Sequence, residues 1–211
     1  CWAFTGHCAH FSAAKCDRWK SGCGDCPQLK AYPKTYGADH TQRNYRQKQA
    51  CFTGLANLTI IVPSEWLART VKQSFLKEYP VEVVHNQIDK SLFKPTQSDF
   101  REQYVLDGKT VILGVASVWD KEKGLLDFCR LREKLDSQFA IVLVGVTEKQ
   151  KSRLLPGILA LPRTANPGEL AEIYSAADVF VNPTHQDTYP TVNLEARACG
   201  TPVITYDVGG S

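Results

Sequence analysis

Short apolar runs alternate with amphipathic stretches along most of residues 57–206. Short runs rich in Val and Ile predict buried strands, whereas stretches with apolar residues three or four apart predict helices. The predicted strands lie at 58–63, 81–84, 109–117, 138–146, 158–162, 177–183 and 202–206. The predicted helices lie at 64–77, 123–135, 168–176 and 190–199, with a short one between 146 and 158. This alternation predicts an α/β fold with parallel, doubly wound sheets.

An irregular segment, HNQIDKSLFKP, interrupts the alternation and ends at Pro95. We therefore predict a domain boundary near residues 85–97, with one domain at 1–90 and another at 91–211. Both are expected to be Rossmann-like, the first truncated on its N-terminal side and the second incomplete at its end. The chain begins with Cys and contains no Met, so we expect a fragment of a longer protein that lacks both ends.

Composition and charge are those of a soluble protein, with 43% hydrophobic residues, 22% charged residues and a net charge of +3. No apolar run reaches the roughly 20 residues that span a bilayer, so we expect a cytoplasmic protein. The small positive charge leaves a peripheral contact with the inner face of the membrane open. It does not predict a nucleic-acid partner, because no basic surface interleaved with aromatic residues is visible.

The stretch at residues 187–206 places two carboxylates, Asp187 and Glu195, on either side of a predicted helix start. Pro190 suits a first helical position, and Gly200 suits the end of the same helix. Exposed amides at a helix start attract anions, so the amides of Thr191 and Val192 predict a phosphate site. The spacing of the two carboxylates suits hydroxyl groups on either side of a diphosphate.

The turn GVASVWDKEKG, residues 114–124, is a second candidate phosphate contact. Small residues near Ser117 allow a ligand to approach the backbone, and Lys121 and Lys123 supply positive charge. The turn contains no G-x-G-x-x-G pattern, which argues against a dehydrogenase.

These two stretches resemble motifs of the retaining family-four glycosyltransferases of GT-B fold. The pattern D-x7-E followed by ARACGTPVI is similar to their E-x7-E signature, and the turn is similar to their G-R-x4-K-G motif. Asp187 is shorter than the usual Glu, Pro190 replaces a Gly, and Val118 replaces the Arg. The loss of that Arg removes a bidentate phosphate clamp, for which Lys121 replaces only the charge.

The resemblance implies catalytic roles for Asp187, near the donor sugar, and for Lys123, on the diphosphate. It implies that Glu195 binds the nucleotide ribose. The donor-binding residues are then expected to be Ser117, Lys121, Lys123, Tyr189, Thr191, Val192 and Glu195.

The function implied is transfer of a sugar, with retention, from a nucleotide-diphosphate sugar to a saccharide or a lipid-linked saccharide. The setting implied is surface polysaccharide, exopolysaccharide or lipopolysaccharide biosynthesis. No cofactor is expected to be required for catalysis, since this family usually needs no divalent metal, and the fragment itself is expected to be inactive. A sugar-nucleotide epimerase or hydrolase on the same scaffold is the alternative enzyme. A zinc-dependent interaction or nucleic-acid-binding module is the alternative of another class.

The first 26 residues are rich in cysteine. Cys8, Cys16, Cys23 and Cys26 form the pattern C-x7-C-x6-C-x2-C, which predicts a structural zinc site. Two disulfides, or four unpaired thiols, are the alternatives. His7 and His10 are substitute ligands in the zinc hypothesis.

The run WAFTGHC resembles a cleft loop of some polysaccharide-assembling family-four enzymes. The resemblance implies that Thr5, Gly6 and His7 face the acceptor. The alternative is an aromatic corner formed by Trp2 and Phe4.

Overall fold

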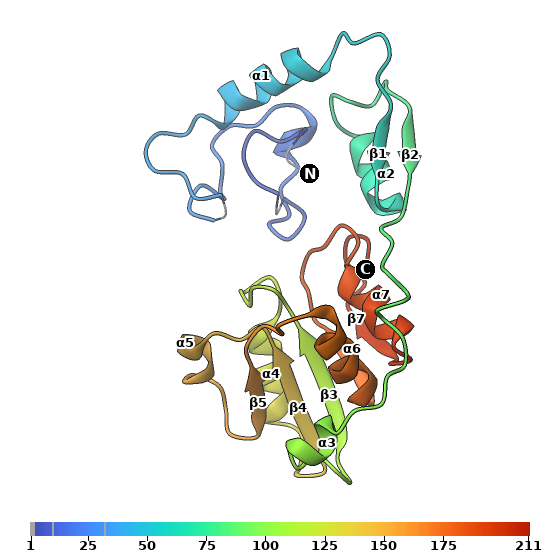
Figure 1. Cartoon of the computed structure of the whole chain (residues 1–211). Helices are drawn as coiled ribbons and strands as arrows, with labels where there is room; N and C mark the ends of the chain where they lie inside the picture. Colours follow the sequence, from blue (N-terminus) through green and yellow to red (C-terminus); the bar gives the residue numbers. More distant parts are fainter. Residues whose placement is uncertain (1–2, 10, 32) are drawn as a thin grey trace. The chain divides into compact units, whose positions relative to one another are not determined.

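The computed structural model describes residues 3–9, 11–31 and 33–211, and the chain divides into two units between His85 and Asn86 (Figure 1). This division falls at the start of the irregular segment that interrupts the sequence pattern. Within the described residues, no helix is both long and apolar enough to cross a membrane.

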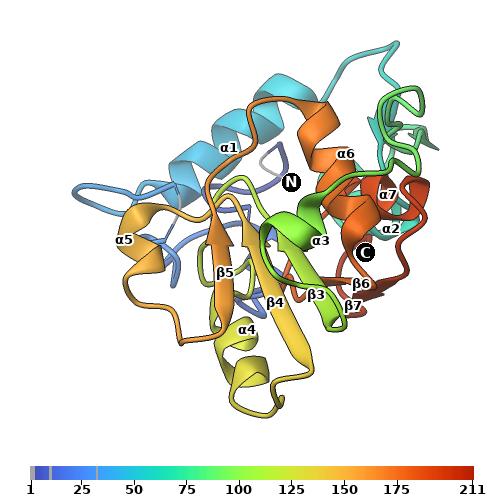
Figure 2. The same ribbon diagram turned by 60° about the horizontal axis from the view of Figure 1, so that its bottom comes forward.

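The second unit contains a five-stranded sheet in which every pairing is parallel. Its order is β5-β4-β3-β6-β7, and Figure 2 shows β5, β4 and β3 side by side. The strands are β3 Thr110–Val115, β4 Phe139–Val144, β5 Ile158–Leu161, β6 Val179–Asn182 and β7 Val203–Thr205. The predicted α/β fold class with parallel sheets is therefore confirmed.

Helices connect these strands. They are α4 Leu125–Arg132, α5 Glu148–Lys151, α6 Pro167–Ala176 and α7 Thr191–Ala198, and the short α3 Phe100–Gln103 precedes β3. Successive side chains of a strand point to opposite faces of a sheet. The sheet therefore packs against two hydrophobic clusters, one on each face. Leu113 and Phe180 belong to the cluster that includes residues of α6 and α7, whereas Ile112 packs with Phe128 of α4.

The strand order fixes where the ends of the strands meet. The chain runs from β3 to β4 and β5, then returns to pair β6 on the other side of β3. In open parallel sheets, ligands bind outside the carboxyl ends of the strands at such a reversal. The loops after β3 and β6 therefore contain the positions where a ligand site is expected.

The first unit contains η1 Arg18–Lys20, α1 Thr41–Phe52, β1 Ile60–Val62, α2 Glu65–Val71 and β2 Val81–Val83. Ser64 caps α2 as predicted, because its hydroxyl accepts a hydrogen bond from the Leu67 amide at 3.3 Å. The predicted helix 64–77 is too long, since α2 ends at Val71 and turns follow. Leu76 is nevertheless buried in the same core.

Candidate functional site

A cavity of about 220 Å³ lies where the loops after β3 and β6 meet the start of α7. It brings together two parts of the sequence, residues 115–123 and residues 182–192. The residues that line it are Val115, Ala116, Ser117, Lys123, Asn182, Asp187, Tyr189, Pro190, Thr191 and Val192. Both stretches predicted to contact a phosphate therefore contribute to one site.

An ion pair joins the two residues predicted to be catalytic. The Lys123 ammonium donates to Asp187 Oδ2 at 2.7 Å, with side-chain exposures of 36% and 19%. Asp187 Oδ1 accepts from the Tyr189 amide at 3.2 Å, and the Lys123 amide donates to Asp120 Oδ1 at 2.9 Å. Both members of the pair are thus held toward the cavity by their own loops.

The helix that borders the cavity starts one residue later than predicted. Pro190 is the N-cap, with φ −72° and ψ 114°, and α7 begins at Thr191. The first amides of a helix have no carbonyl partner within the helix, and they carry partial positive charge. Thr191 and Val192 both line the cavity, so this helix start borders a space in which an anion would be favoured.

Buried polar contacts fix the start and the end of α7. The Asn182 side-chain amide at the end of β6 donates to Asn193 Oδ1 at 2.9 Å, and both residues are buried. At the far end, Gly200 has φ +86°, and its amide donates to Arg197 while Thr201 donates to Ala196. This is the Schellman arrangement, which satisfies the last carbonyls of the helix.

Glu195 lies one turn further along α7 and outside the lining of this cavity. Its Oε2 accepts from the Tyr174 hydroxyl at 3.0 Å, and the Thr191 side chain also bonds to it. Burial raises the pKa of Glu195, while these two hydrogen bonds act in the opposite direction. The two carboxylates of the motif therefore have different surroundings.

The loop that carries Lys123 is held against the loop after β6. The His185 amide donates to the Glu122 carbonyl at 2.8 Å, and the Thr184 hydroxyl donates to the same oxygen at 3.3 Å. Gly124 has φ +76°, and a side chain there would collide with Pro183. Lys121 is exposed and does not line the cavity, so only Lys123 of the two predicted lysines lies at the site.

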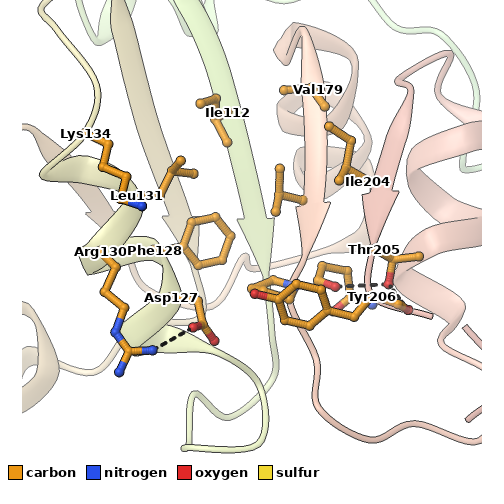
Figure 3. Close-up of a pocket in the computed structure, with 13 residues that line it drawn as sticks. Ile112, Asp127, Phe128, Arg130, Leu131, Lys134, Val179, Ile204, Thr205 and Tyr206 are labelled. Carbon is orange, nitrogen blue, oxygen red and sulfur yellow. Dashed lines mark hydrogen bonds and ion pairs between the residues drawn. The ribbon is translucent and has the colours of Figure 1, made fainter. Parts of the chain in front are cut away.

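A second cavity, of about 480 Å³, lies beside α4 and was not predicted from the sequence (Figure 3). Its walls are mainly apolar side chains of β3, β6, β7 and α4, including Ile112, Phe128 and Ile204. Asp127 at its edge is engaged by Arg130 at 3.3 Å and by His185 at 2.9 Å. The first turn of α4 presents the Asp127 carboxylate to this mainly apolar cavity, so the cavity at α7 is the better candidate for a diphosphate.

In the first unit, the residues predicted to face an acceptor make contacts within the unit. Thr5 is buried and donates to the Cys8 carbonyl at 2.8 Å. Gly6 packs against the Thr41 carbonyl, with no room for a side chain. His7 Nδ1 lies 3.4 Å from the Thr35 hydroxyl.

Phe4, one member of the alternative aromatic corner, belongs to a cluster of aromatic side chains. Phe4, Phe11 and Trp19 pack together, with ring centroids 4.9 to 5.9 Å apart. Trp2, the other member of the expected corner, and the substitute ligand His10 lie outside the described residues.

The four cysteines of the zinc hypothesis surround one small cavity of about 20 Å³. Cys8, Cys16, Cys23 and Cys26 all line it, and the Gly6 amide donates to Cys23 Sγ at 3.1 Å. Burial raises the pKa of Cys23 and of Cys26. Within the described ranges, however, no three His, Cys, Asp or Glu side chains are arranged to hold a metal ion. The zinc site stays a prediction.

Comparison with known families gives a match for the second unit. Residues 109–211 match the family described as glycosyl transferases group 1. The chain is 28% identical over 145 residues to a D-inositol 3-phosphate glycosyltransferase of Segniliparus rotundus, covering 62% of this chain and 32% of the relative. It is 29% identical over 179 residues to an alpha-maltose-1-phosphate synthase of Mycobacterium tuberculosis, covering 74% of this chain and 45% of the relative.

Solved structures of glycosyltransferases share the fold. Sucrose-phosphate synthase from Thermosynechococcus elongatus superposes with a TM-score of 0.66 at 23% identity, over 83% of this chain and 47% of that one. Anabaena HepE, in complex with UDP-glucose, gives 0.62 at 21% identity, over 80% of this chain and 50% of that one. The chain therefore spans half or less of the length of these four proteins.

Proposed function

We propose that this chain carries the donor-binding part of a nucleotide-sugar-dependent glycosyltransferase, starting from the match of residues 109–211 to glycosyl transferases group 1. The observation that carries the proposal is the cavity at the carboxyl ends of β3 and β6. It combines a lysine, a carboxylate and a helix start, which are the groups that a sugar diphosphate needs.

The proposed chemistry places the diphosphate between Lys123 and the amides of Thr191 and Val192. Negative charge grows on the leaving phosphate as the sugar departs, and fixed positive groups stabilise that charge. The Lys123 ammonium must exchange Asp187 for a phosphate oxygen, since the two are paired at 2.7 Å. Asp187 is then free to accept from hydroxyl groups of the sugar, while Glu195 accepts from the ribose.

The proposal also covers the stereochemistry of the reaction, the acceptor and the residues that contact each substrate. The reaction proceeds with retention at the sugar, and the acceptor is a saccharide or a lipid-linked saccharide in polysaccharide biosynthesis at the inner face of the membrane. Ser117 and Tyr189 contact the donor, whereas His7 faces the acceptor. The relatives' names point to varied acceptors. Because Anabaena HepE was solved with UDP-glucose, a UDP-sugar is the first donor to test.

A structural role for zinc is proposed separately for the first unit. The support is that Cys8, Cys16, Cys23 and Cys26 line one cavity. Four thiolates would close the coordination shell and leave no position for chemistry. Metal analysis tests this proposal, with the outcomes given in the Discussion.

Nucleotide binding with and without Lys123 tests the donor site. The change is Lys123→Gln, and we expect UDP affinity to fall about tenfold or more, since hydrogen bonds to charged groups contribute roughly 1.5 to 3 kcal/mol. Lys109→Gln is the matched control, because Lys109 is exposed at the opposite end of β3. Equal affinity for Lys123→Gln and the control would refute the site.

The alternative functions predict different products. An epimerase would return an isomerised nucleotide sugar, and a hydrolase would release free sugar without an acceptor. Incubation of a complete protein with UDP-glucose, with and without saccharide acceptors, distinguishes these reactions by chromatography. A nucleic-acid-binding module would instead retain a labelled oligonucleotide, in a salt-dependent manner.

A further inference from the structure

A hydrogen bond outside the cavity joins the buried Tyr174 to Glu195. Tyr174 lies on α6 and Glu195 on α7, and the Tyr174 hydroxyl donates to Glu195 Oε2 at 3.0 Å. Tyr174 is fully buried and Glu195 is half-buried. We propose that Tyr174 is a positioning residue, which holds the Glu195 carboxylate in the orientation that binds the ribose of a nucleoside diphosphate. This inference rests on the proposed function.

The position of the Tyr174 hydroxyl is fixed by the core. Its ring packs edge to face against Phe180 of β6, with centroids 5.5 Å apart, and against Phe93 at 6.3 Å. The Thr201 hydroxyl donates to the Tyr174 carbonyl at 2.6 Å. A tyrosine ring has only two side-chain torsions, and close packing leaves it one rotamer. The hydroxyl is therefore a rigid anchor for a carboxylate that would otherwise rotate.

The hydrogen-bonding capacity of Glu195 fits this role. An ionised carboxylate offers about four acceptor positions. Tyr174 occupies one, and the Thr191 side chain occupies another. Two positions remain, which is the number that the two neighbouring hydroxyls of a ribose require. Because Thr191 also lines the cavity at α7, a diphosphate in that cavity would leave its ribose next to Glu195.

The same contact also affects the ionisation of Glu195. Burial raises its pKa, and the Tyr174 and Thr191 hydrogen bonds lower it. Cys199, the C-cap residue of α7, is the other described titratable group that interacts with this carboxylate. Loss of the Tyr174 hydroxyl should therefore raise the Glu195 pKa further. Ribose binding requires the ionised Glu195 carboxylate in this proposal. Binding is therefore present above the Glu195 pKa and is lost as the pH falls through that pKa.

The test uses Tyr174→Phe, which removes one oxygen and keeps the packed ring. Tyr104→Phe is the matched control, because Tyr104 packs against Phe100 of the same unit, away from Glu195. Carbon-13 NMR titration of the glutamate carboxyls follows the Glu195 pKa without any ligand. Calorimetry then compares UDP, GDP and ADP with their 2′-deoxy analogues across pH.

We expect Tyr174→Phe to raise the Glu195 pKa and to move the acid limit of nucleotide binding to higher pH. We also expect the preference for the nucleotide over its 2′-deoxy analogue to fall about fivefold, since orientation of a charged acceptor contributes energy of this order. Tyr104→Phe should change neither. A general loss of stability would not selectively change the preference for ribose.

Three results would overturn the inference. An unchanged Glu195 titration in Tyr174→Phe would show that the contact does not act on the carboxylate. A raised pKa with an unchanged ribose preference would refute the positioning role while leaving the proposed function intact. Failure of the unaltered chain to bind any of the three nucleotides would refute the proposed function itself, and the ribose role with it.

Discussion

The ion pair between Lys123 and Asp187 makes a prediction that separates nucleotide binding from turnover. Asp187→Asn keeps the shape of the side chain and the acceptor for the Tyr189 amide, and it removes the negative charge that pairs with Lys123 at 2.7 Å. If Lys123 binds the diphosphate, Asp187 competes with the ligand for that lysine. The variant should therefore bind UDP more tightly, although it should transfer sugar more slowly.

The magnitude follows from the exposure of the pair. The side chains are 36% and 19% exposed, so solvent screens their attraction, and the pair contributes about 0.5 to 1 kcal/mol. Release of Lys123 should then strengthen UDP binding by roughly two- to fivefold. The gain should shrink at high salt, because screening already weakens the ion pair whose removal produces it.

Calorimetry with UDP at low and high salt measures this change. Asp136→Asn is the matched control, because Asp136 caps the turn before β4 and lies outside the cavity. Weaker UDP binding by Asp187→Asn would refute the reasoning, because Asp187 would then support the nucleotide instead of competing with it. Unaltered turnover in a complete protein would refute its role near the sugar.

Two further predictions concern the scaffold and the cysteines. Asn193→Ala should lower the free energy of unfolding of the second unit by about 1 to 3 kcal/mol, because it leaves the buried Asn182 amide without its acceptor. Urea titration measures this change. A loss of stability no larger than that of an exposed Asn→Ala change would contradict the role of this contact. Protein purified without added zinc should contain one zinc per chain, held by the four cysteines that line the small cavity of the first unit. A zinc content near zero, with all four thiols titratable, would reject the zinc site.

The sequence predicted much of the second unit because its signals are local. The apolar runs at 109–117 and 177–183 contain β3 and β6, and Gly200 closes α7 as its position suggests. Local signals were weaker in the first unit. Helix α1 buries only Thr41 and Tyr45, so it has no apolar stripe to reveal it, and the predicted helix 64–77 continues past the turn that follows Val71.

The contacts of the site were harder to predict, because they join residues distant in sequence. The strand reversal at β3 brings Lys123 to Asp187, and the motifs indicated both residues but not their ion pair. Tyr174 gave no chemical signal, since a buried aromatic residue in a helix normally belongs to the core. Its hydroxyl lies beside Glu195 only because α6 packs against α7, a contact between distant residues that the sequence pattern does not show.

The most direct test of the donor site is an amide NMR titration of this chain with UDP. The largest shifts are expected at Ser117, Lys123, Thr191 and Val192, which line the cavity of about 220 Å³ at the start of α7. Lys123→Gln should reduce these shifts at equal UDP concentration. Shifts centred instead on Phe128, Leu131 and Ile204, in the cavity shown in Figure 3, would contradict the donor site.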